Sequence, residues 1–443
     1  MNLIDSLNRI VLKTDRGVFW LSSALCLSLC LIIIFVISPL TGLSKNFSGN
    51  DGYIQIAENL VRGNGYVFEK DGSQIFHRPP FYPLFLVPVA IFPVNWQRFV
   101  LIFPQSLLVG LISLLIFKIA KRCFNLSVAR IAVIIFLINP WVYWNAKNPM
   151  TQILQGFLYA AFVWLVGNEL FPPVKTSETQ QSGGGPLLKS AVIGATSAAI
   201  ALTHAAMLVV VVVNLFIVSV VAITQRRKQL FLTFISAGVI AIVLIAPWTY
   251  RNWVVFHRFI PIAGGGGLAY FNGNVHWSCI EEFPQRPGES YIDASIRVLG
   301  IDGTEKTHTH WKGFKDIKYE ELADKKMAEH IRNHPVPFME KFILNAIEFY
   351  FPAFVKPFLA IKTITSEQIV LSIFHLVLWV AAGVSIFSCW RKSLLLLAGI
   401  FIYAVWYFPF ATGFIAHSPY TFGTIPLLSI LAAKGLTTAG NIR

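Results

Sequence analysis

Charged residues are scarce in this chain of 443 residues, at 13% of the total, against about one quarter in ordinary soluble domains. Hydrophobic residues make up 55%, and the mean hydropathy is +0.62. This balance excludes a soluble globular protein and predicts an all-α protein that spans a membrane many times. About ten apolar runs approach the roughly 20 residues that a crossing needs. They lie near Phe19 to Leu40, Gln97 to Lys118, Ser127 to Trp144, Met150 to Gly167, Ser190 to Thr203, Ala205 to Ile223, Leu230 to Pro247, Gln368 to Ser388, Ser393 to Phe410 and Tyr420 to Ala433.

Acidic residues are also few, at 22 against 36 Lys and Arg, which leaves a net charge of +14. In a soluble protein such an excess would suggest nucleic-acid binding. Here the predicted inner segments contain 16 Lys and Arg but 4 acids, whereas bases and acids nearly balance in the two long outer loops. The excess is therefore the positive-inside signal of a membrane protein. It predicts cytoplasmic N- and C-termini and no nucleic-acid partner.

The region from Ala191 to Ile223 is ambiguous, because it has room for one long span or two short ones. Lys189 before it and Arg226 to Lys228 after it both have the basic character of cytoplasmic segments. The chain should therefore cross twice, with the two short helices meeting at Thr203-His204.

Cysteine is rare, and of the five present only Cys279 falls in an outer loop, so no disulfide framework is expected. The first apolar run is too long for a signal peptide and lacks a cleavage site, which predicts a retained helix. No Asp-x-Asp occurs, and His308 and His310 have no third ligand at suitable spacing. We predict no cofactor and no strict metal requirement, although a divalent metal stays possible.

The topology divides the chain into five parts. They are an N-terminus with the first helix (1–40), a first outer loop (41–96), helices two to seven (97–247), a small outer domain (248–367) and the C-terminal helices (368–443).

The first outer loop combines three local signals. Apolar residues from Tyr53 to Val61 recur at helical spacing, which predicts an interfacial amphipathic helix. Asp71-Gly72 is a dipeptide favoured in two-residue turns and predicts a small hairpin. Arg78 precedes two prolines, which hold it extended, and the second of them can open a helix from Phe81 to Phe92.

Asp51 and Arg78 each have an ordinary explanation. Asp51 could cap the amphipathic helix, and Arg78 could anchor the loop on lipid headgroups. Together they place a carboxylate and a guanidinium in one constrained loop. A transferase acting on a phosphate-linked lipid needs such a pair, because a base must take a proton from the acceptor and a cation must stabilise the leaving phosphate.

These residues belong to a longer pattern that resembles bacterial GT-C-fold glycosyltransferases, the group with protein O-mannosyltransferases and the lipid A aminoarabinose transferase. The first part is Asp51-Gly-Tyr53, Ala57, Asn59-Leu60, Gly63-Asn-Gly65-Tyr66 and Arg78-Pro79-Pro80-x-Tyr82-Pro83. The second is Pro247-Trp248-x-x-Arg251-Asn252-x-x-x-Phe256, with Pro261 and Gly273-Asn274, followed by Asn333-His334-Pro335 and Phe338.

The resemblance implies an inner-membrane enzyme that transfers a sugar, probably with inversion, from a polyprenyl-phosphate donor to a lipid, glycan or protein acceptor at the outer face. It makes Asp51 the catalytic base and Arg78 a ligand of the lipid phosphate. Arg251 is a second phosphate candidate, with a snorkelling anchor as its alternative. The remaining candidates for the substrate cavity are Tyr53, Glu58, His77, Tyr82 and Asn252. A polyprenyl-lipid flippase or a non-catalytic scaffold of a polysaccharide pathway remains as an alternative function.

Overall fold

The structure is a computed structural model that describes residues 14–37, 52–70, 72, 74–171, 185–267, 270, 297, 299–300, 317–351, 353, 366–411 and 418–440. Within these residues the secondary structure is helical apart from one isolated β-bridge. The main α-helices of the transmembrane body are α2 (Asp15–Ile32), α6 (Val94–Cys123), α7 (Leu126–Leu137), α8 (Pro140–Ala146), α9 (Gln152–Leu170), α10 (Pro186–Thr203), α11 (Met207–Thr224), α12 (Lys228–Phe256), α18 (Ser366–Ser388), α19 (Trp390–Ala411) and α20 (Ile425–Gly440).

The apolar helices confirm a membrane protein with many spans. Among the described residues, seven helices are long and apolar enough to cross a membrane. An eighth crossing would be formed by α7 and α8 together, which are bent by 58° at Asn139. The Asn139 side chain accepts a hydrogen bond from the Trp141 N–H and so caps α8 at the bend. The prediction of about ten spans stays a prediction, because α19 and α20 have shorter apolar stretches.

The ambiguous region forms two helices, as the charges around it predict. α10 ends at Thr203 and α11 begins at Met207, with His204 between them. α10 packs along α12, and Gly194 permits the close approach, since a Cβ there would lie 2.6 Å from the Ala237 carbonyl oxygen. Small residues at helix crossings are typical of membrane bundles.

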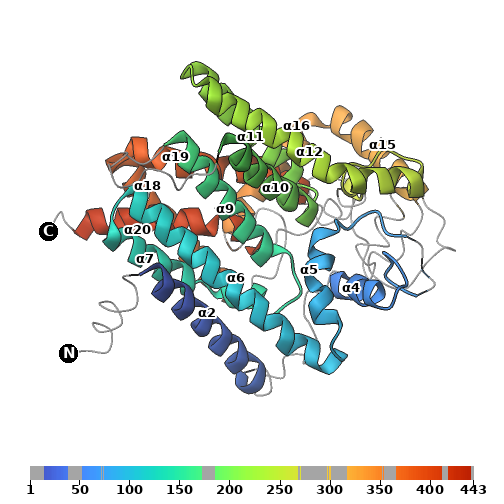
Figure 1. Cartoon of the computed structure of the whole chain (residues 1–443), viewed down its shortest axis with the longest axis horizontal. Coiled ribbons are helices and arrows are strands. Elements are labelled where there is room, and N and C mark those ends of the chain that lie inside the picture. Colours follow the sequence, from blue (N-terminus) through green and yellow to red (C-terminus); the bar gives the residue numbers. More distant parts are fainter. Residues whose placement is uncertain are drawn as a thin grey trace.

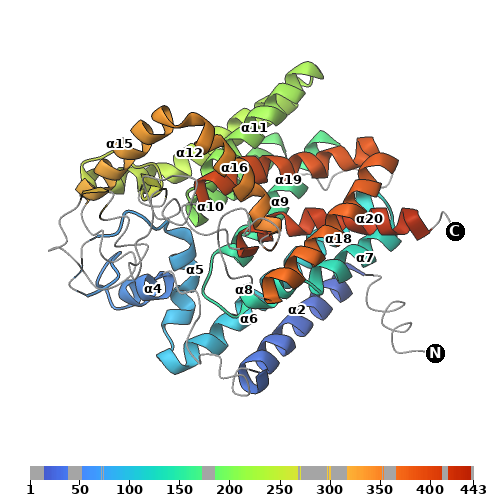
Figure 2. The same cartoon turned by 180° about the vertical axis from the view of Figure 1, so that it is seen from behind.

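Figure 1 shows α2 and α6 side by side along one edge of the bundle, and α11 and α12 projecting from the opposite edge. Seen from behind, α18 crosses beside α20 (Figure 2). The start of α2 and the end of α20 lie at the same end of the bundle, which agrees with an even number of crossings. Which side of the membrane this end faces stays a prediction.

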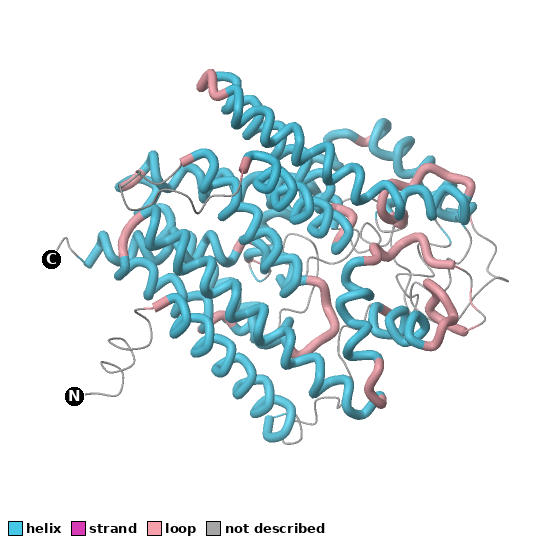
Figure 3. Tube along the Cα trace, viewed as in Figure 1, coloured by secondary structure: helices cyan, strands magenta, loops and turns pink. Residues whose placement is uncertain are grey.

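The other end of the bundle carries the helices of the two predicted outer loops. They are α4 (Tyr53–Val61), α5 (Phe81–Ala90), α15 (Ile317–Asn333) and α16 (Pro335–Tyr350). Most of the described loop segments gather between α4, α5, α12 and α15 (Figure 3). This end of the protein contains every described residue that the sequence assigns to a site.

Candidate functional site

The start of α4 is the centre of the candidate site. Asp51 itself lies outside the described residues, so its predicted role as base remains a prediction. The cap residue of α4 is Gly52, which has a φ of +85° and makes no side-chain capping bond. A Cβ at Gly52 would overlap the Phe68 ring, so both the backbone and the packing require glycine here.

The amphipathic helix forms as predicted, but it packs against protein on more than its expected face. Tyr53, Ile56 and Ala57 are buried as the pattern predicts, and Ile54 at the edge of the same face is buried as well. The predicted apolar residue Val61 is 42% exposed instead. Asn59 on the opposite, polar face is also buried.

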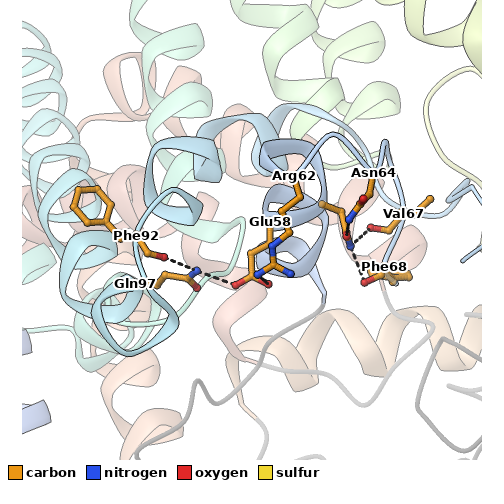
Figure 4. Close-up of polar contacts among 8 residues, drawn as sticks. Glu58, Arg62, Asn64, Val67, Phe68, Phe92 and Gln97 are labelled. Carbon is orange, nitrogen blue, oxygen red and sulfur yellow. Dashed lines mark hydrogen bonds and ion pairs between the residues drawn. The ribbon is translucent and has the colours of Figure 1, made fainter. Parts of the chain in front are cut away.

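Polar side chains of two consecutive residues connect α4 to its neighbours, and Figure 4 shows these contacts. Glu58, a predicted cavity residue, accepts a 2.8 Å hydrogen bond from the Gln97 side-chain amide and lies 4.0 Å from the Arg62 guanidinium. Asn59 donates to the carbonyl oxygens of Val67 and Phe68 at 3.0 and 2.9 Å. Glu58 therefore joins α4 to the start of α6, while Asn59 joins α4 to the hairpin.

The predicted hairpin is present as an antiparallel bridge between Val67 and Gln74, although Asp71 lies outside the described residues. The Ile75 N–H donates to the Tyr66 carbonyl oxygen at 3.2 Å. The hairpin turns the chain back so that Arg78 returns to the start of α4.

Arg78 packs on the first turn of α4, because its guanidinium carbon lies 5.2 Å from the centre of the Tyr53 ring. The Tyr66 hydroxyl donates to the carbonyl oxygens of Arg78 and Pro79, at 3.1 and 2.9 Å, and so holds the backbone of this segment in place. Burial strongly raises the pKa of Tyr66, which keeps this hydroxyl protonated as a donor. Arg78 therefore lies over Tyr53, a residue that follows Asp51 by two positions in the sequence.

Tyr82 is fully buried and His77 is half-buried, close to Arg78 along the chain. Burial, with a smaller effect of the Arg78 charge, lowers the pKa of His77 to about 3, so its imidazole is neutral at physiological pH. Its ring lies against Phe68 and Phe76. The Tyr82 ring meets the Tyr53 ring edge to face at 5.2 Å, and its hydroxyl accepts a long hydrogen bond from Gln105. Tyr82 therefore supports the aromatic face on which Arg78 rests.

Arg251, near the outer end of α12, is engaged by the hairpin. Its guanidinium donates to the Ile75 carbonyl oxygen at 3.0 Å and to the Gln74 side chain at 2.5 Å. It also lies 4.9 to 5.6 Å from the centres of three aromatic rings. These rings belong to Trp248, Phe256 and Tyr66. Arg251 thus connects α12 to the first outer loop.

Asn252 has a structural setting as well. It is fully buried, accepts a hydrogen bond from Arg251, and donates to the carbonyl oxygens of Ile260 and Ile262 at 3.0 and 3.1 Å. These bonds fold the chain back immediately after α12. Of the residues assigned to the predicted cavity, Arg251 and Asn252 therefore contact the hairpin and the turn, whereas Arg78 and Tyr53 contact each other.

His204 is a neighbour of Arg78 that the sequence suggests only as a packed histidine. Burial, and to a lesser extent the Arg78 charge, lowers the pKa of His204 to about 4. Its ring packs edge to face on Tyr407 of α19, whose hydroxyl donates to Gln155 of α9. The Gln155 amide donates in turn to the Tyr403 hydroxyl at 2.8 Å. A break between two spans facing the outer side is the signal that could have drawn attention to His204.

The described residues contain no group of three or more His, Cys, Asp or Glu side chains placed to hold a metal ion. The metal expectation remains untested, since several candidate ligands, including His308 and His310, lie outside those residues. What the site offers chemically is a guanidinium on an aromatic face, two neutral imidazoles and a helix N-terminus, a combination suited to binding an anion.

The fold is that of GT-C membrane glycosyltransferases, which confirms the fold class that the sequence pattern indicated. The resemblance is one of structure, since no protein-family profile and no curated protein sequence matches the chain.

The archaeal oligosaccharyltransferase AglB from Archaeoglobus fulgidus, solved with an inhibitory peptide and a dolichol-phosphate, has a TM-score of 0.55 and 12% sequence identity to this chain. The match covers 97% of this chain and 50% of that protein. Its apo form gives a TM-score of 0.52 at 11% identity, over 97% of this chain and 51% of that protein. The chain thus spans about half the length of these relatives. A weaker similarity, with a TM-score of 0.39 and 14% identity, covers 95% of this chain and 79% of ArnT from Cupriavidus metallidurans bound to undecaprenyl phosphate.

Proposed function

We propose that this protein is a glycosyltransferase that moves a sugar from a polyprenyl-phosphate donor to an acceptor at the outer face of the membrane. The fold supports the class of enzyme, and AglB was solved with a dolichol-phosphate. The observation that carries the proposal for this chain is the packing of Arg78 on Tyr53, at the start of the helix that follows Asp51. It places a permanent cation against a residue that follows Asp51 by two positions in the sequence.

In the proposed reaction, the Asp51 carboxylate accepts a proton from an acceptor hydroxyl or amine. The acceptor atom then bonds to the anomeric carbon of the sugar from the side opposite the lipid phosphate, while the bond between that carbon and the phosphate oxygen breaks. The phosphate leaves with the bonding electrons, and the Arg78 guanidinium stabilises its growing negative charge. Displacement in one step inverts the anomeric configuration.

His77 and His204 would contribute as uncharged groups in this reaction. Their lowered pKa values keep both imidazoles neutral near pH 7, so neither would compete with Arg78 for the phosphate as a second cation. Arg251, engaged by Gln74 and Ile75, would act mainly by holding the hairpin that returns Arg78 to α4. We place the enzyme in a bacterial inner membrane because of the resemblance of its motifs, and we place both termini in the cytoplasm because of the charge distribution of the sequence.

The decisive experiment measures transfer of a labelled sugar from a panel of polyprenyl-phosphate donors by the purified protein in detergent or nanodiscs. We expect Asp51→Asn to lower the rate at least a hundredfold while leaving thermal stability close to wild type. Glu69→Gln, a neutralised acid in the same loop, is the matched control and should retain activity. A wild-type rate in Asp51→Asn would reject the base assignment. Donor binding without transfer would favour a flippase, and neither binding nor transfer would favour a scaffold.

A further inference from the structure

The segment Gly264 to Gly267, which follows α12, joins the candidate site to α15. On one side the Gly264 N–H donates to the Phe76 carbonyl oxygen at 2.9 Å, next to His77 and Arg78. On the other side, the Gly265 N–H donates to the Glu320 carboxyl oxygen at 2.6 Å. The Gly267 N–H lies 3.4 Å from the same oxygen and 3.1 Å from a carboxyl oxygen of Asp324. A run of four glycines is typical of a mobile loop, but here hydrogen bonds attach the segment on both sides.

Three of the four glycines are required by close packing or by backbone conformation. A Cβ at Gly264 would lie 2.9 Å from the Phe76 ring, and one at Gly267 would overlap the backbone of Asp324. Gly265 has a φ of +104°, which side chains rarely tolerate. Gly266 is different, because a Cβ there would meet open space. The segment is therefore fitted between the first outer loop and α15.

Glu320 and Asp324, whose carboxyl groups hold this segment, lie on the strongly charged helix α15, but Glu320 is only 1% exposed. Burial, together with the neighbouring Asp324 carboxylate, raises the pKa of Glu320 to about 7 against the opposing effect of the glycine N–H groups. The Asp324 carboxylate also binds the Arg258 guanidinium at 2.7 Å. The carboxyl pair of Glu320 and Asp324 thus lies between the Arg258 guanidinium and the two glycine N–H donors.

The charged and titratable groups around the pair come from three elements. Glu321 on α15 is largely exposed and lies 3.9 Å from Arg258, which follows α12. From the first outer loop, His77 faces Gly265, since a Cβ at Gly265 would lie 3.3 Å from the His77 Cβ. With its pKa near 3, His77 stays neutral above pH 4.5. Glu320 is the group in this arrangement whose charge changes as the pH rises from 4.5 to neutrality.

We propose that Glu320 and Asp324, acting through the backbone of Gly264 to Gly267, position the Phe76 to Arg78 segment, and that loss of the proton from this carboxyl pair weakens the attachment. Glu320 is then a positioning residue for the candidate site. Its effect on transfer rests on the proposed function, whereas the attachment itself does not.

The direction of the pH effect follows from linkage. Glu320 has an ordinary pKa of 4.5 when released into solvent and a raised pKa in the attached state, so the proton favours attachment. The attachment is strongest below pH 4.5, weakens as the pH rises towards 7, and changes little above that. Between pH 5 and pH 7.5 the opening equilibrium should increase roughly tenfold or more.

Hydrogen–deuterium exchange on the full chain in nanodiscs, corrected for the intrinsic rate at each pH, measures this opening. Peptides covering residues 260–267 should lose protection roughly tenfold or more between pH 5 and pH 7.5 in the wild type. Glu320→Gln should remain protected at both pH values, because its neutral amide still accepts from Gly265 and can donate to Asp324. Glu321→Gln, on the adjacent exposed residue, should respond like the wild type. A pH response that persists in Glu320→Gln, or is absent in the wild type, overturns the proposal.

A steric pair of variants tests the same attachment without changing charge. Gly267→Ala should expose residues 260–267 to exchange at both pH values and raise the KM for the lipid donor several-fold, whereas Gly266→Ala should match the wild type. Equal protection in these two variants would also overturn the proposal. If no variant or wild-type protein transfers sugar but exchange still follows this pattern, the proposed function fails while the positioning role stands.

Discussion

Arg78 and Arg251 are both predicted to hold the lipid phosphate, but the structure gives them different surroundings. Arg251 donates to Ile75, Gln74 and Asn252 and lies among three aromatic rings. Arg78 lies over the ring of Tyr53, at the N-terminus of α4. A guanidinium already spread over protein acceptors contributes to folding, whereas one at a helix N-terminus adds to a region that attracts anions. Sequence position alone could not separate these roles, since both residues follow recognisable motifs.

The largest expected effect is on catalysis at Arg78. Arg78→Ala should lower the rate of sugar transfer about a hundred- to a thousandfold, because the leaving phosphate loses its cation in a low-dielectric site. Arg78→Lys should recover part of the rate, since an ammonium supplies charge without the planar fork. The midpoint of thermal unfolding should change little. Arg62→Ala, which removes a guanidinium whose side chain is 63% exposed on the same loop, is the control for surface charge.

A wild-type rate in Arg78→Ala would show that Arg78 is not needed for catalysis. Unfolding of Arg78→Ala at a clearly lower temperature, measured by intrinsic tryptophan fluorescence on heating, would show that Arg78 is needed for folding. In that case Arg78 would share the structural role that the contacts assign to Arg251.

Arg251→Ala should act mainly on stability. Three hydrogen bonds from a charged donor and its stacking on Trp248 are lost, and we expect about 2 to 3 kcal/mol of destabilisation. Arg251→Lys should not rescue it, because one ammonium cannot reach all of these acceptors in the same geometry. The measurement is the unfolding midpoint of purified protein in detergent. If Arg251→Ala folds normally but no longer binds polyprenyl phosphate, Arg251 is a ligand of the lipid phosphate instead.

Features that depend on local composition could be predicted from the sequence. Hydropathy and charge predict the membrane spans, because both depend on local composition. The two short helices that meet at His204 are predicted by the basic residues on both sides of this region, which require the chain to cross the membrane twice. Helical spacing predicts α4 from Tyr53 to Val61, but it could not show that Asn59 on the polar face is buried, since Asn59 binds the hairpin that follows α4.

The candidate site was harder to predict from the sequence, because its contacts join residues that are not neighbours along the chain. The Asp71-Gly72 turn predicts that the chain reverses direction, but it does not reveal that Arg78 then meets Tyr53. Glu320 in a strongly charged stretch has the pattern of a solvated helix, yet the glycine segment covers it. Which residues meet across such distances, 55 positions between Gly265 and Glu320, cannot be read from the local pattern of one sequence.

Gly52→Ala tests whether the start of α4 must keep its conformation for Arg78 to be effective. The alanine would need a left-handed backbone, at a cost of about 1 to 2 kcal/mol, and its Cβ would overlap Phe68. Gly63→Ala is the matched control, because Gly63 has a similar φ of +73° but open space around it. Gly52→Ala should therefore have the lower unfolding midpoint and the slower transfer. Equal effects in both variants would mean that the Phe68 contact is unimportant.

The smallest effect concerns Tyr66, whose hydroxyl connects the two arginines by holding the backbone of Arg78 and Pro79 while its ring contacts Arg251. Tyr66→Phe keeps the ring and removes one donor shared between two carbonyl oxygens, so we expect about 1 kcal/mol of destabilisation and a reduction of a few-fold in transfer rate. Tyr250→Phe, on a side chain that is 70% exposed at the same end of α12, should leave both unchanged. Because the Arg251 contacts remain in Tyr66→Phe, a loss of rate beyond the loss of stability would show that the Arg78 backbone position itself governs catalysis. A loss of stability with an unchanged rate per folded molecule would show that the Tyr53 ring is sufficient to place the guanidinium.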